Sequence, residues 1–76
     1  MIKKRLDYET TIDPNEFSNE PTDEEIQQLI EIAKQNPDCI VRVYWYMKYN
    51  GWFTRPIMAD DTIDTFKAKM PKDYGL

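Results

Sequence analysis

Apolar and polar residues alternate along the first segment of the chain. From Ile2 to Ile12, most even-numbered positions are apolar, and the odd-numbered positions are charged or polar. This period of two is typical of a strand with one buried face. We therefore expect a first strand here, followed by a polar loop that extends to Pro21.

The stretch from Cys39 to Ala59 predicts a β-hairpin at the centre of a sheet. It contains both tryptophans and three of the five tyrosines. An Asn50-Gly51 step joins two runs that are rich in β-branched and aromatic residues. This combination is the strongest short-range indication of a hairpin.

The length of the hairpin loop decides which side chains share a face of the sheet. A two-residue Asn50-Gly51 loop would pair Tyr49 with Trp52 and would leave both faces mixed. A three-residue loop with Gly51 in the left-handed region pairs Lys48 with Trp52 and gathers the apolar residues on one face. We expect this second register. The predicted core face contains Val41, Val43, Trp45, Met47, Phe53, Ile57 and Ala59, and is interrupted by Arg55.

Two other segments show helical spacing. Residues Thr22 to Glu25 form a capping box, which satisfies amide groups of a first helical turn. Apolar residues then recur every three or four positions as far as Ala33, and Pro37 ends the helix because it restricts the residue before it. A short second helix is expected from about position 62 to about position 70, with Asp61 as its N-cap. A further strand over this segment is the alternative.

The order strand, helix, strand, strand, helix predicts an α+β domain that spans residues 1–76. The expected architecture has two layers, which are a three-stranded sheet of antiparallel type and two helices on one of its faces.

Nothing in the sequence indicates catalysis. The chain has no histidine and a single cysteine, which excludes His-based zinc sites, catalytic triads and an internal disulfide. Asp60, Asp61 and Asp64 suggest a magnesium or calcium site, but acidic caps at a helix start are the simpler interpretation. We therefore expect no enzymatic activity and no cofactor or metal. Without a long apolar run or a signal peptide, the chain is expected to be soluble and cytoplasmic, with no membrane contact.

The net charge of −4 is distributed unevenly along the chain. No lysine or arginine occurs between Leu6 and Ala33, whereas ordinary surfaces mix both signs of charge. Positions 20, 24, 27 and 31 lie one turn apart, which predicts a continuous row of side chains on one side of the helix. A solvated helix face is the simple interpretation, and docking onto a basic groove is the functional one. The candidate residues are Asp13, Glu16, Glu20, Asp23, Glu24, Gln27 and Glu31.

The second candidate surface is the other face of the hairpin, where Tyr44, Tyr46 and Trp52 lie among Arg42 and Lys48. Its composition resembles the stacking platforms of single-strand nucleic-acid binders. Burial under the second helix and self-association are the alternatives, and the acidic net charge argues against direct nucleic-acid binding. The three aromatic residues are then the apolar anchors of a protein interface.

In its small size, its acidic flank and its lack of a catalytic constellation, the chain resembles the small inhibitor proteins that phages and mobile elements encode, including anti-CRISPR and anti-restriction proteins. The resemblance implies stoichiometric binding to the basic surface of a host nucleic-acid-handling enzyme, in the host cytoplasm. The alternatives are a nucleic-acid-binding or regulatory module that uses the aromatic face, and a structural assembly subunit. A homodimer is also compatible with the sequence.

Overall fold

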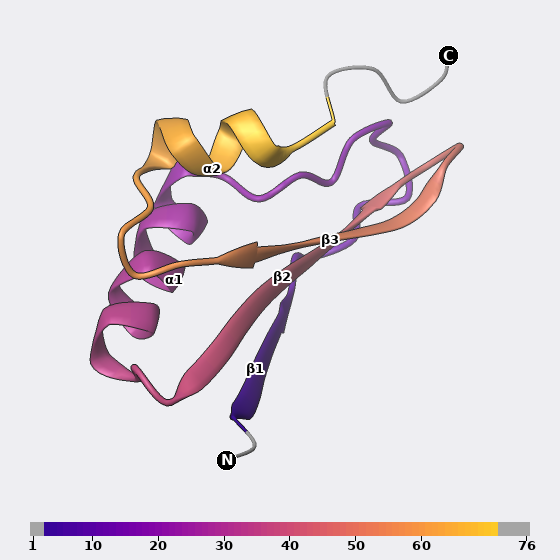
Figure 1. Cartoon of the computed structure of the whole chain (residues 1–76). Helices are drawn as coiled ribbons and strands as arrows, with labels where there is room; N and C mark the ends of the chain where they lie inside the picture. Colours follow the sequence, from indigo (N-terminus) through magenta and orange to yellow (C-terminus); the bar gives the residue numbers. More distant parts are fainter. Residues whose placement is uncertain (1–2, 72–76) are drawn as a thin grey trace.

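A computed structural model of the chain describes residues 3–71. The strands are β1 (Lys4–Glu9), β2 (Cys39–Met47) and β3 (Gly51–Ile57), and the helices are α1 (Asp23–Gln35) and α2 (Ile63–Lys69). Both helices lie on one face of the three-stranded sheet (Figure 1). The predicted α+β fold and its order of elements are confirmed.

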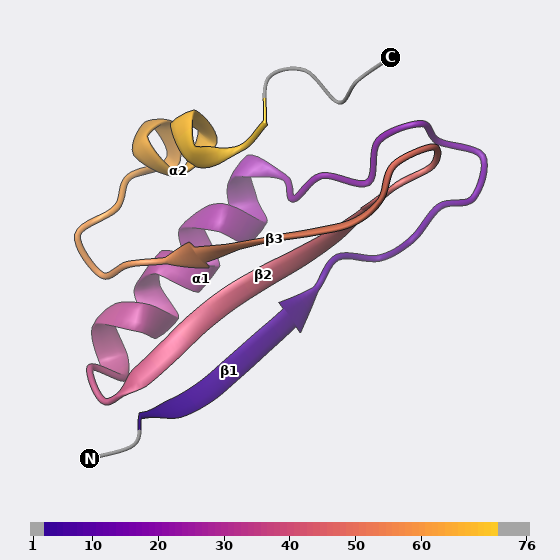
Figure 2. The same cartoon turned by 45° about the vertical axis from the view of Figure 1, so that its right-hand side comes forward.

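The sheet is mixed, which corrects the expectation of an antiparallel type. Its strand order is β1-β2-β3; β2 pairs with β1 in parallel and with β3 in antiparallel orientation. Helix α1 carries the chain back along the sheet between β1 and β2 (Figure 2). Such a crossover connection makes the two strands it joins parallel.

The core lies between the sheet and the two helices. Trp45, Val43 and Met47 of β2 are completely buried, and the Trp45 ring stacks on the partly buried Phe53 ring with 6.0 Å between their centroids. Ala59 is exposed and lies beyond the end of β3. The prediction that Ala59 belongs to the core face is therefore wrong. The buried apolar residues are Ile26, Leu29, Ile30, Ala33, Val41, Val43, Trp45, Met47, Ile57, Phe66 and Met70.

The predicted faces of the residues within β2 and β3 are right, but the predicted register is wrong by two positions. Trp52 pairs with Tyr46 and not with Lys48. The turn begins earlier than expected, because the Asn50 N–H donates to the Met47 carbonyl oxygen at 3.1 Å. Gly51 adopts a φ of +84°, as predicted. A shift by two residues preserves the alternation of faces, and this register places aromatic rings opposite each other on both faces.

Arg55 is the one charged residue on the core face of β3. Its Nε donates to the Lys69 carbonyl oxygen at 2.9 Å, and one terminal nitrogen donates to the Thr54 carbonyl oxygen at 2.8 Å. Because the last carbonyls of a helix lack partners within the helix, Arg55 satisfies one of them at the end of α2. The guanidinium therefore attaches α2 to the sheet.

The capping box at the start of α1 is confirmed. The Glu25 N–H donates to the Thr22 hydroxyl oxygen at 3.2 Å, and the Thr22 N–H donates to the Glu25 carboxylate at 3.0 Å. Asn36 is the C-cap residue, directly before Pro37. Both ends of α1 thus follow from local sequence.

The N-cap of α2 is Thr62 and not Asp61, which corrects the prediction. Asp61 instead accepts hydrogen bonds from the Thr65 hydroxyl at 2.8 Å and the Lys69 ammonium at 2.6 Å. Burial on its own would raise the pKa of Asp61, but these donors and the Met58 N–H outweigh it and hold the pKa below its usual value. Asp61 therefore joins the start of α2 to its last turn.

The loop between β1 and α1 returns to β2 beyond the end of β1. The Asn19 N–H donates to the Tyr46 carbonyl oxygen at 3.2 Å, and the Lys48 N–H donates to the Phe17 carbonyl oxygen at 3.0 Å. The Phe17 ring lies 5.8 Å from the Tyr49 ring. The loop is thereby fixed beside the hairpin turn.

Candidate functional site

The face of the sheet that points away from the helices is the first candidate site, and we call it the outer face. Residues that pair across β1, β2 and β3 point to the same side, so the two register sets define its members. Neither α1 nor α2 lies on it (Figures 1 and 2). The alternative that the second helix buries the aromatic residues is therefore wrong. The outer face comprises Arg5, Asp7, Glu9, Ile40, Arg42, Tyr44, Tyr46, Trp52, Thr54 and Pro56.

The aromatic residues of the outer face are partly exposed and held by neighbours. The Trp52 side chain is 49% exposed, and its ring and the Tyr46 ring form a T-shaped pair with 5.5 Å between their centroids. The Tyr44 hydroxyl accepts a hydrogen bond from Arg5 at 2.8 Å. The structure therefore brings the three predicted aromatic residues together on one surface.

Charges of both signs surround these rings. Arg5 and Arg42 lie on the same face as Asp7 and Glu9, since the parallel register places Asp7 beside Arg42 and Glu9 beside Tyr44. The sequence alone does not assign Arg5, Asp7 and Glu9 to this face, because their side follows only from the pairing of β1 with β2. An aromatic centre with arginines and a rim of mixed charge has the composition of a protein–protein interface.

The acidic residues of α1 form the second candidate surface. Glu24, Gln27 and Glu31 are exposed on the side of α1 that faces away from the sheet, and the Gln27 amide donates to the Glu31 carboxylate at 3.0 Å. Lys34 lies 3.5 Å from Glu31. Three members of the predicted row lie on α1, whereas Glu20 precedes the helix, and Glu31 has a basic neighbour one turn away.

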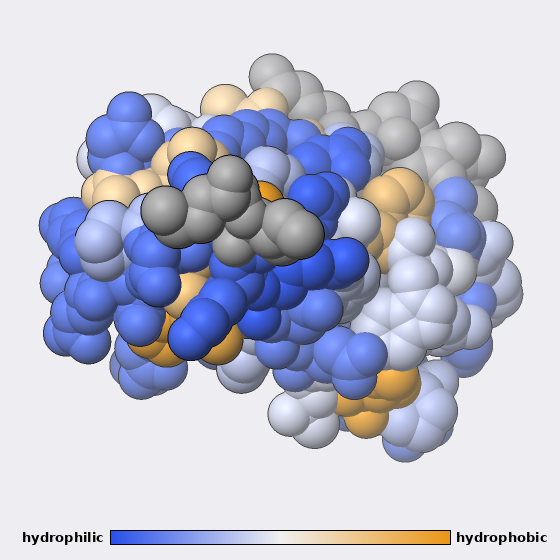
Figure 3. Space-filling view, turned by 60° about the horizontal axis from the view of Figure 1, so that its bottom comes forward, coloured by the Kyte–Doolittle hydropathy of each residue, from blue (hydrophilic) through white to orange (hydrophobic). Residues whose placement is uncertain are grey.

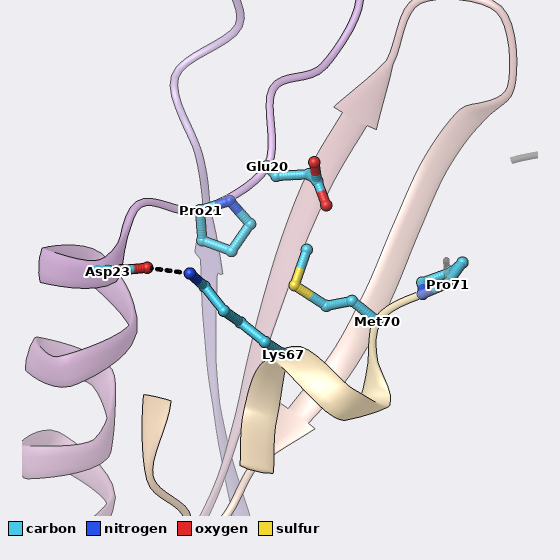
Figure 4. A pocket seen from close by; sticks show the side chains of 6 residues that line it. All are labelled: Glu20, Pro21, Asp23, Lys67, Met70 and Pro71. Atoms are coloured by element: carbon cyan, nitrogen blue, oxygen red, sulfur yellow. Dashed lines mark ion pairs between the residues drawn. The ribbon is translucent and has the colours of Figure 1, made fainter. Parts of the chain in front are cut away.

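Asp23 has a basic partner that its sequence neighbourhood does not contain. The Lys67 ammonium of α2 lies 2.6 Å from the Asp23 carboxylate. This ion pair borders a hollow of about 310 Å³, in which Lys67 points toward Asp23 and the tip of the Met70 side chain points toward Glu20 (Figure 4). Packing of α2 against the start of α1 therefore reduces the acidic character at this end of the helix.

Of the acidic residues in the loop, Asp13 and Glu16 belong to the segment beside the hairpin turn, whereas Glu20 lies close to the start of α1. Asp13 accepts a hydrogen bond from the Asn15 N–H at 2.9 Å, which is a local turn contact, and Asp13 and Glu16 precede the Phe17 contact with the hairpin turn. Glu20 accepts from the Ser18 hydroxyl at 2.7 Å and lies near Asp23. The seven candidate residues thus divide between two regions.

The acidic helix and the outer face lie on opposite sides of the sheet. Side chains of β2 alternate between the buried face under α1 and the outer face. A single flat partner surface therefore does not contact Glu24 and Trp52 together. A partner that contacts both must extend around an edge of the sheet.

Among residues 3–71, no group of three or more histidine, cysteine, aspartate or glutamate side chains is arranged to hold a metal ion. In the same part of the chain, no helix has the length and apolar character required to cross a membrane. The carboxylate of Asp61, which the sequence offered as a metal ligand, is occupied by the contacts of α2.

Comparison of the chain with models of protein families, with curated proteins and with solved structures gave no match. Functional inference therefore depends on the geometry of the two surfaces.

Proposed function

We propose that the protein is a small binding module that docks on another protein through its outer face. The supporting observation is that Tyr44, Tyr46 and Trp52 form one uncovered cluster beside Arg42. Tyrosine, tryptophan and arginine are the residues that dominate binding energy at protein interfaces. A fold of this size gains stability when aromatic side chains enter its core, so three aromatic residues outside the core favour a binding role.

The partner in this proposal is a protein with a basic surface, such as the nucleic-acid-binding groove of a host enzyme. The net charge of −4 and the exposed carboxylates on α1 provide a long-range attraction to such a groove. Charge complementarity of this kind mainly accelerates encounter, whereas buried aromatic anchors supply most of the affinity. The protein would act as a stoichiometric inhibitor of the anti-CRISPR or anti-restriction type, because it occupies the groove without chemistry.

The test compares the proteins that the wild type captures with those that its variants capture. Wild-type protein, Trp52→Ala and Tyr46→Ala are immobilised and exposed to the same bacterial lysate, and bound proteins are quantified by mass spectrometry. Met58→Ala is the matched control, because Met58 is 53% exposed and lies beyond the end of β3. We expect a partner that Met58→Ala retains and both outer-face variants lose. A partner that all four proteins bind equally would contradict the proposal.

Single-stranded nucleic acid is the second candidate ligand, favoured by the exposed Trp52 ring and the partly exposed Tyr46 ring. Stacking on such rings contributes about 1–3 kcal/mol per base. Asp7 and Glu9 on the same face oppose it, because they repel phosphates. Quenching of tryptophan fluorescence by oligonucleotides at low salt measures this binding directly. No quenching in the wild-type protein would exclude the candidate.

A further inference from the structure

Strand β1 is an open edge of the sheet. It pairs with β2 along one side, and within residues 3–71 no strand pairs with its other side. All six of its residues are exposed, and Figure 2 shows β1 as the outermost strand. An open strand edge offers unpaired N–H and C=O groups to another chain.

The direction of these backbone groups follows from the parallel pairing. The Thr10 N–H donates to the Tyr44 carbonyl oxygen at 2.9 Å. In a parallel pair, alternate residues direct both of their backbone groups toward the neighbouring strand. The even-numbered residues of β1 therefore direct their N–H and C=O groups toward β2. Arg5, Asp7 and Glu9 direct theirs to the open edge.

An apolar hollow lies next to this edge, on the helix side of the sheet. It has a volume of about 170 Å³ and lies between β1 and α1, with Leu6, Tyr8, Leu29 and Ile32 in its lining. Leu6, Tyr8 and Ile32 are 39%, 36% and 37% exposed, because α1 covers β2 more fully than β1. Around the end of the sheet where β1 begins, apolar side chains form small areas among hydrophilic ones (Figure 3).

The charges of β1 are complementary to those of a second copy in one register. Lys3 and Arg5 precede Leu6, and Asp7 and Glu9 follow it. In an antiparallel pair centred on Leu6, Arg5 lies opposite Asp7 of the second copy, and Lys3 lies opposite its Glu9. A pair centred on Arg5 or on Asp7 would place that residue opposite the same residue of the second copy, so that two like charges would meet. Like charges directly opposite are destabilising, whereas unlike charges are stabilising.

We propose that two copies of the chain associate through antiparallel pairing of their β1 strands about Leu6, which forms a six-stranded sheet. The backbone allows this register, because Arg5 and Asp7, which would pair with each other, both direct their N–H and C=O groups to the open edge. Leu6 then forms the closer, non-hydrogen-bonded type of pair with its symmetry mate, with about 4.5 Å between Cα atoms. The two leucines close the apolar hollows over the two-fold axis.

The pairing also explains Lys4, a charge on the helix side of an edge strand. Natural edge strands use such lysines to prevent pairing with foreign chains. In the proposed register Lys4 lies opposite Tyr8 of the second copy, and within each chain the Tyr8 hydroxyl donates to the Glu25 carboxylate. The ammonium therefore meets a ring and a nearby carboxylate in the dimer, and it discourages other partners. In the six-stranded sheet, the outer faces of the two copies lie on the same side. The proposed pairing does not depend on whether these faces bind another protein.

The test is a charge exchange measured by sedimentation equilibrium and native mass spectrometry. Arg5→Asp places acids opposite acids in the homodimer, and Asp7→Arg places arginines opposite arginines. Each change turns two symmetry-related pairs from attractive to repulsive, which should weaken self-association about tenfold or more. An equal mixture of the two variants restores unlike pairs at both positions, so it should form a mixed dimer.

We expect the wild-type protein to sediment with twice the 9.1 kDa mass of the chain, each variant to be monomeric at the same concentration, and the mixture to be dimeric. Lys34→Asp and Asp60→Arg, which make the same charge changes at exposed positions outside β1, should remain dimeric. Circular dichroism confirms that each variant folds. A monomeric wild-type protein, dimers of both single variants, or a mixture without mixed dimers would overturn the proposal.

Discussion

Replacing each tryptophan in turn compares how much a residue of the core and a residue of the outer face contribute to the free energy of unfolding. A tryptophan side chain has roughly 200 Å² of surface, and Trp52 is 49% exposed, so it buries about 100 Å². At about 25 cal/mol per Å², and with allowance for residual burial in the unfolded chain, Trp52→Ala should lower the free energy of unfolding by about 2 kcal/mol. Trp45 is completely buried, and its replacement by alanine should cost about 3–5 kcal/mol.

The loss expected for Trp45→Ala equals the whole stability that a single core of this size supplies, which is about 3–5 kcal/mol. We therefore expect Trp52→Ala to fold cooperatively with a lower urea midpoint, and Trp45→Ala to be largely unfolded in buffer. Urea denaturation followed by far-ultraviolet circular dichroism measures both variants at one protein concentration, so that any self-association affects them equally. If Trp45→Ala unfolds at the same urea concentration as Trp52→Ala or a higher one, the assignment of the two faces is wrong.

Three further outcomes test local features of the fold. Thr22→Ala removes the capping oxygen of α1 and should lower the free energy of unfolding by about 1 kcal/mol, whereas an unchanged urea midpoint would show that the cap is dispensable. Gly51→Val should cost about 1 kcal/mol or more because valine tolerates a φ of +84° poorly, and chemical denaturation measures the loss; a neutral effect would contradict this turn. Because the pKa of Asp61 is lower in the folded protein than its usual value, its stabilising contribution is present above about pH 4 and is lost as the pH falls further. Asp61→Asn should therefore be less stable than the wild type at pH 7, and the difference in the free energy of unfolding should shrink as the pH falls below about 4. A stability difference that does not change with pH would refute the Lys69 contact.

Local patterns in the sequence predicted much of the fold. The period of two assigned the faces of β2 and β3 correctly, because alternation does not depend on the exact pairing partner. The capping box fixed the start of α1 through contacts within four residues. The hairpin register was missed by two positions because it depends on the contacts of Tyr46 with Trp52 and of Trp45 with Phe53 across strands, which no single segment encodes.

The candidate surfaces were predictable in composition but not in arrangement. The acidic span contains no lysine or arginine in sequence, yet packing of α2 brings Lys67 to Asp23. The parallel pairing of β1 places Asp7 and Glu9 beside the aromatic rings. The crossover through α1 places that helix on the opposite side of the sheet. Both effects arise from contacts between segments that are far apart in the chain, so inspection of each segment alone did not reveal them.

The most direct measurement of the proposed binding surface is an NMR titration of the isotope-labelled protein with the partner that the comparative capture identifies. Chemical shift changes in the amides and side chains should concentrate on the outer face, around Tyr44, Tyr46, Trp52 and Arg42, while the exposed side of α1 changes little. Changes that concentrate on Glu24, Gln27 and Glu31 and leave the Trp52 indole unaffected would show that the acidic helix is the contact surface, and would contradict the account.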